Sequence, residues 1–179
     1  MRRDKRSLAA DNRGMSLVEM VIVVAIMTVL TGVAAIGVSM ALSKPVDECA
    51  EKIVSTLNGA RITTMGKQEI KLRFVQNDNG VYLTETIKDA SGATTTRPDL
   101  RIGQKGVVVR YKLVGDANYR ELSGTSIELS FKRTTGGFNT LIESGSDTGD
   151  YCTEIQVSKA GKEKVIEIAY LTGKVTIIQ

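Results

Sequence analysis

The chain has 179 residues, with 24 Lys and Arg against 20 Asp and Glu, so its formal net charge is +4. It contains no His and only two Cys, which excludes Ser–His and Cys–His catalytic pairs and argues against a zinc site. No glycine-rich phosphate loop of the P-loop type is present. The composition therefore favours a protein that is not an enzyme and that needs no metal or other cofactor.

Residues 1–14 form a short basic segment, with five Arg and Lys against two Asp. The rest of the chain carries 24 − 5 = 19 basic and 20 − 2 = 18 acidic residues, so its net charge is close to zero. The positive net charge of the whole chain comes mostly from residues 1–14 and is therefore weak evidence for a nucleic-acid partner. A basic segment before an apolar run keeps the N-terminus in the cytoplasm and sends the following chain across the membrane. In a secretory signal the small-residue cleavage site follows the apolar core, but here Gly14 precedes it. Cleavage after Gly14 would keep the apolar segment and create an amine on Met15.

The run from Met15 to Leu42 contains about 28 residues and one charge, Glu19. A transmembrane helix needs roughly 20 apolar residues, so we expect residues 15–44 to form a membrane-spanning helix. An acid within such a segment costs on the order of 2.5–3.5 kcal/mol. Nothing else in the run can pair with Glu19, so the partner is expected to come from another molecule or from a new chain end.

The helix is predicted to continue over residues 45–66 as an amphipathic segment. Apolar residues recur there at spacings of three and four, which places them on one face. Pro45 is expected at a kink or in the first turn of a second helical piece, and Gly66 is a plausible stop.

Residues 67–179 are predicted to form an antiparallel β domain, because polar and apolar residues alternate between turns. The fold class is therefore α+β, a long helix packed on an antiparallel sheet. The expected strands are residues 69–75, 81–84, 107–114, 126–132, 138–142, 152–157, 164–171 and 174–178, and the expected loops include 88–97 and 143–150.

Cys49 and Cys152 lie far apart in the sequence. Outside the cytoplasm, an even pair of cysteines usually forms a disulfide, and this bond would connect the helix to the C-terminal part of the β domain. Two buried free thiols are the alternative.

The segment Gly14-Met15-Ser16-Leu17-Val18-Glu19, with the basic leader before it and the apolar helix after it, resembles the processing site of the type IV pilin and pseudopilin superfamily. The resemblance implies that prepilin peptidase cleaves between Gly14 and Met15 and methylates the Met15 amine. It also implies that Glu19 contacts the Met15 amine of a neighbouring subunit during assembly. Pairing of the two groups within one chain is the competing interpretation.

The back half of the chain, with Gly136-Gly137, Gly161 and Gly173-Lys174-Val175, is similar to the GspH/FimT type of minor pilins and pseudopilins. The resemblance implies a structural subunit of a type IV pilus, a type II secretion system or a competence apparatus. Its partners would be prepilin peptidase, other pilins, the inner-membrane assembly platform and, before assembly, membrane lipid. The N-terminus would be cytoplasmic, and the C-terminal domain would lie in the periplasm or at the cell surface.

The alternative is a monomeric membrane-anchored binding module that never assembles and that contacts DNA. Lysines near the C-terminal hairpins could form such a DNA contact, or they could belong to a solvated face with interleaved acids. Asp147, Asp150 and Glu154 are candidate calcium ligands near a polar loop.

Overall fold

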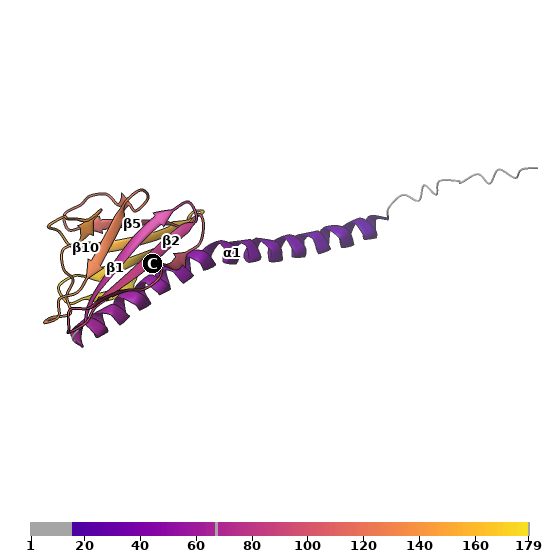
Figure 1. Cartoon of the computed structure of the whole chain (residues 1–179). Helices are drawn as coiled ribbons and strands as arrows, with labels where there is room; N and C mark the ends of the chain where they lie inside the picture. Colours follow the sequence, from indigo (N-terminus) through magenta and orange to yellow (C-terminus); the bar gives the residue numbers. More distant parts are fainter. Residues whose placement is uncertain (1–15, 67, 179) are drawn as a thin grey trace, which may run out of the picture. The chain divides into compact units, whose positions relative to one another are not determined.

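The computed structural model describes residues 16–66 and 68–178, and for residues 33–42 it describes the backbone alone. The chain divides into two units, Met1–Ser39 and Met40–Gln179. The described residues form one long helix and twelve strands, which gives the α+β class predicted from the sequence (Figure 1).

Helix α1 spans Leu17–Met65 and continues through Pro45 without interruption. It ends where the sequence predicts, because the Gly66 N–H donates to the carbonyl oxygens of Ile62 and Thr63 at 3.2 and 3.0 Å and the chain then turns. The expected second helical piece starting at Pro45 is therefore part of the same helix.

The first sheet is antiparallel and contains seven strands in the order β3-β2-β1-β7-β8-β9, with β4 also pairing with β2. The strands β1 and β2 form a hairpin in which Asn77 pairs with Gly80. The bounds are β1 Glu69–Asn77, β2 Gly80–Lys88, β3 Thr94–Thr96, β4 Leu100–Gly103, β7 Ser126–Ser130, β8 Ile142–Glu143 and β9 Ser146–Asp147.

The second sheet is also antiparallel, and its order is β12-β11-β10-β5-β6. The hairpin β10–β11 turns at Ala160 and Gly161, whose φ angles of 50° and 79° are those of a type I′ turn. The bounds are β5 Val108–Leu113, β6 Arg120–Glu121, β10 Cys152–Lys159, β11 Lys162–Ala169 and β12 Lys174–Ile177.

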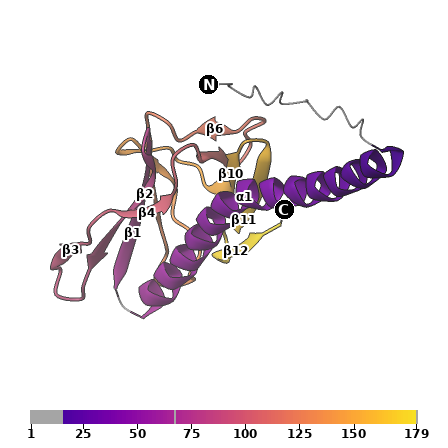
Figure 2. The same ribbon diagram turned by 90° about the vertical axis from the view of Figure 1, so that its right-hand side faces the viewer.

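Both sheets and the C-terminal part of α1 share one hydrophobic core. The helix contributes side chains at three- and four-residue spacing, namely Val46, Cys49, Ala50, Ile53, Leu57 and Ala60. All six are at most 3% exposed, so the amphipathic face predicted from the sequence packs in the core. Figure 2 shows this part of α1 running along the strands. Polar contacts fix the same packing: Lys164 lies 3.6 Å from Asp47, and the Arg61 Nε–H donates to the Gly136 carbonyl oxygen at 3.2 Å.

The structure corrects three details of the predicted β domain. Residues 138–141 do not form a strand, and Ile142 begins β8: the Phe138 N–H donates to the Tyr170 carbonyl and the Asn139 N–H to the Ser130 carbonyl, so this segment connects the two sheets. The expected loop at 88–97 contains the short strand β3, and the expected loop at 143–150 contains β9 and the last residue of β8. The strands β4 and β6, and the division into two sheets, were not predicted.

Candidate functional site: the start of the N-terminal helix

The first turn of α1 is closed by Ser16. The backbone N–H of Glu19 donates to the Ser16 side-chain oxygen at 3.2 Å, and the Met20 N–H donates to the Ser16 carbonyl oxygen at 3.1 Å. A Ser at the N-cap with Glu three residues later is the capping-box sequence, which satisfies backbone donors at a helix start. The segment Ser16-Leu17-Val18-Glu19 displays this signal in the sequence, and it could have predicted where the helix begins.

The cap places Glu19 in the first turn of the helix. A carboxylate is favoured there, because backbone N–H groups give a helix N-terminus a partial positive charge. The Glu19 side chain is exposed, and no ion pair involves it within residues 16–66 and 68–178. Gly14 and Met15 lie outside the described residues, so the predicted cleavage position and the predicted contact of Glu19 with a Met15 amine stay predictions.

The surface around Glu19 is apolar on every side of the helix. From Leu17 to Leu30 every large apolar side chain is exposed, from 38% for Val23 to 80% for Leu17. A helix that is apolar all round normally lies in the interior of a larger assembly or in lipid. The exposed apolar side chains of residues 17–30 therefore require lipid or neighbouring helices around them, which the described residues do not provide.

Among the described residues, no helix is both long enough and apolar enough to cross a membrane. The span predicted from the sequence, residues 15–44, lies partly outside the described part, since Met15 and the side chains of residues 33–42 belong to the portion left undescribed.

The two cysteines are both buried, and both are free thiols in the structure, so the expected disulfide is not formed there. Cys49 lies on α1 against the first sheet, where a Cβ on Gly103 would be 3.1 Å from its sulfur. Cys152 begins β10 in the second sheet, and its thiol donates to the Glu154 carbonyl oxygen at 3.5 Å. Both cysteines belong to the same hydrophobic core, and two buried free thiols are the alternative that the sequence left open. Burial raises the pKa of both thiols from 9.0 to about 12, so they stay protonated at neutral pH.

Several of the lysines and acids that the sequence offered as DNA or calcium contacts form hydrogen bonds or ion pairs within the chain. The Lys159 ammonium donates to the Lys105 carbonyl oxygen at 2.8 Å, and Lys164 pairs with Asp47. The Asp147 carboxylate accepts hydrogen bonds from Thr140 and from the Gly149 N–H, and Glu154 accepts one from the Tyr119 hydroxyl. No group of three or more potential metal ligands occurs within the described part of the chain.

Comparison with known proteins adds one finding. Residues 10–35 match the family model of the prokaryotic N-terminal methylation motif. This match supports a type IV pilin-like protein. The motif implies processing by prepilin peptidase, membrane anchoring through the N-terminal helix and assembly with other pilins. The matched residues contain Gly14, Met15, the cap and Glu19, and they end before the β domain. No significant match to the chain was found among curated proteins or among solved structures.

Proposed function

We propose that this protein is a non-enzymatic filament subunit, a minor pilin or pseudopilin of the GspH/FimT type. It would serve a type IV pilus, a type II secretion system or a competence apparatus. Prepilin peptidase would cleave between Gly14 and Met15 and methylate Met15, and the inner-membrane platform would then add the mature subunit to a filament. The N-terminal helix would be the assembly surface.

The observation that carries this proposal is Glu19, an exposed carboxylate in the first turn of a helix whose surroundings are apolar on all sides. Packing such helices side by side removes them from water, and an unpaired carboxylate in that environment is costly. A nearby cation offsets the cost. Cleavage after Gly14 supplies that cation, because it creates an amine on Met15.

Apolar packing supplies the bulk of the adhesion between helices, and the charge pair sets their axial register. The Met15 amine of a neighbouring subunit and the Met15 amine of the same chain could each supply this cation. Only the first couples Glu19 to assembly, so a loss of assembly in a Glu19 variant discriminates between them.

The β domain supports the subtype. It contains a helix face packed on antiparallel strands, a turn at Gly136 and Gly137, and a terminal strand that follows Gly173. These features support the GspH/FimT type, which the family match does not address because it ends at residue 35.

The test is Glu19→Gln in the full-length chain, produced in a host with prepilin peptidase and a complete assembly system. The quantity measured is the fraction of subunit in sheared filaments, relative to the total in the membrane. Glutamine keeps the size of the side chain and inserts more easily into lipid, so leader removal and membrane insertion should continue while incorporation into filaments falls.

Glu51→Gln is the matched control. Glu51 is an exposed acid on the same helix, outside the apolar segment, and its replacement should leave incorporation at the wild-type level. If Glu19→Gln also enters filaments at the wild-type level, Glu19 is not an assembly contact. The membrane-anchored binding module would then be the better account of the chain.

A further inference from the structure

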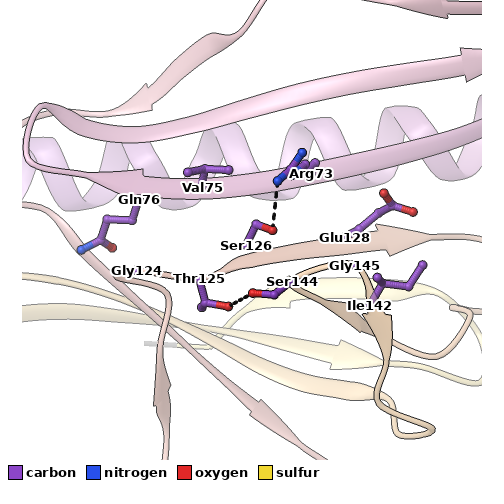
Figure 3. Close-up of a pocket in the computed structure, with 10 residues that line it drawn as sticks. All are labelled: Arg73, Val75, Gln76, Gly124, Thr125, Ser126, Glu128, Ile142, Ser144 and Gly145. Carbon is purple, nitrogen blue, oxygen red and sulfur yellow. Dashed lines mark hydrogen bonds between the residues drawn. The ribbon is translucent and has the colours of Figure 1, made fainter.

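A cavity of about 480 Å³ opens on the face of the first sheet that points away from the core. It lies between β1, β7 and the turn of the β8–β9 hairpin (Figure 3). Its size is within the range of small-molecule sites, roughly 300–1,000 Å³. The proposed assembly function does not use this cavity, which belongs to the β domain and not to the N-terminal helix.

The wall of the cavity contains a guanidinium group without a carboxylate partner. Arg73 on β1 lies directly opposite Glu128 on β7, a position that normally favours an ion pair. Glu128 instead accepts a hydrogen bond from the Lys71 ammonium at 3.0 Å. Arg73 donates only to the Ser126 hydroxyl, at 3.3 Å, and no acid pairs with it in the described residues.

The charges at the cavity therefore sum to one positive charge located on Arg73, because Lys71 and Glu128 neutralise each other. An arginine guanidinium presents several N–H donors in a planar fork that matches the two oxygens of a carboxylate. With one N–H group on Ser126, the remaining donors are available to a ligand.

The rest of the wall is suited to hydroxyl groups and to an apolar ring face. The Thr125 and Ser144 hydroxyls lie 2.7 Å apart and form one hydrogen bond, so each keeps further donor or acceptor capacity. The Gln76 side-chain oxygen accepts from the Val109 N–H at 2.8 Å, which leaves its NH₂ group as a donor. Val75 and Ile142 add apolar surface.

From this arrangement we propose that the cavity binds an acidic sugar residue, with the sugar carboxylate on Arg73. The ring hydroxyls would bond to the hydroxyl and amide groups of the wall, and the ring C–H groups would pack on Val75 and Ile142. A cavity of this volume has room for a sugar ring, and the hydroxyl and amide groups of its wall match a ligand that carries several polar groups.

The test uses the full chain in detergent micelles and two matched pairs of probes, followed by NMR of backbone amides and arginine N–H groups. Methyl β-D-glucuronide and methyl β-D-glucoside differ only at C6, which is a carboxylate in the first and a hydroxymethyl group in the second. We expect the glucuronide to give saturable shifts at Arg73, Ser126 and Ser144 with a millimolar dissociation constant, and we expect the glucoside to bind about tenfold more weakly or not at all, because a charge-assisted pair of hydrogen bonds is lost.

Two variants locate the site. Arg73→Gln should weaken glucuronide binding about tenfold or more, and Ser126→Asp should do the same by placing an internal carboxylate beside Arg73. Arg133→Gln, the same change of charge at an exposed position outside the cavity, should leave binding unchanged. The spectrum of each variant without ligand reports whether it is folded.

Three results would overturn the proposal: no saturable shift with the glucuronide, equal binding of glucuronide and glucoside, or unchanged binding in Arg73→Gln. The second probe pair, acetyl-glutamate amide and acetyl-glutamine amide, tests the source of the carboxylate. Tighter binding of acetyl-glutamate amide than of the glucuronide would contradict the sugar and indicate an acidic side chain of a protein partner. None of these outcomes depends on assembly, so the proposal can fail while the proposed function stands.

Discussion

The amphipathic half of α1 is part of the globular core, and Leu57→Ala measures how much of the domain's stability depends on it. Leu57 is fully buried, with Ile53 and Ala60 beside it on the same helix face and at most 3% exposed. The substitution keeps helix propensity, since Ala is the best helix former. Any loss of stability therefore comes from packing.

The size of the loss follows from the atoms removed. Leu→Ala deletes three buried carbon atoms, and at about 0.8 kcal/mol for each the transfer contribution is about 2.4 kcal/mol. The cavity left behind adds to this, because helix and sheets can close it only in part, so the expected total is about 3–5 kcal/mol. That is a large fraction of the stability of an ordinary domain, about 5–15 kcal/mol.

The assay is urea denaturation of the full chain in detergent micelles, followed by tyrosine fluorescence. Ile62→Ala is the matched control, because Ile62 lies on the same helix but is 72% exposed; it should change the free energy of unfolding by no more than about 0.5 kcal/mol. A loss below about 1 kcal/mol for Leu57→Ala, or equal losses for the two variants, would refute the packing described for α1.

Two further predictions concern the thiols and a glycine. Because burial raises the folded-state pKa of Cys49 and Cys152 to about 12 from 9.0, the stability they contribute is complete below pH 9 and is lost as the pH rises from 9 toward 12. Replacing both by Ala should flatten the alkaline decline in unfolding free energy, and an unchanged decline would contradict their burial as thiols. In the turn before β12, Gly173→Ala should cost at least about 2 kcal/mol more than Gly92→Ala. Both glycines have positive φ, but a Cβ on Gly173 would lie 1.8 Å from the Gly136 carbonyl oxygen, whereas Gly92 faces open space. Equal losses in thermal or urea unfolding would exclude that close approach.

Much of the fold could be predicted from the sequence because the signals are local. The turn Asn77-Asp78-Asn79-Gly80 between two alternating segments predicts the β1–β2 hairpin, and Gly66 predicts the end of α1. Strands such as β4 and β6 have only four and two residues, so they carry no periodicity of their own. They form because a longer strand, β2 or β5, presents an unpaired edge to which they can hydrogen-bond.

The candidate sites also divide into those that the sequence predicts and those that depend on contacts formed in the fold. Glu19 stands out in the sequence because a single acid in an apolar run is costly wherever the run is placed. The Arg73 cavity could not be predicted, because it depends on Glu128 pairing with Lys71 instead of the arginine directly opposite it. Likewise, two cysteines far apart in the sequence are compatible with a bond or with two thiols, because the sequence does not give the distance between their sulfurs.

The most direct measurement of the central claim is the mass of the mature N-terminus after coexpression with prepilin peptidase. We predict a chain shortened by 14 residues that begins at Met15 with a methylated amine, and we predict that Gly14→Val blocks the cleavage. A wild-type chain that keeps residues 1–14 in the presence of active peptidase, or that is cut at another position, would contradict the account.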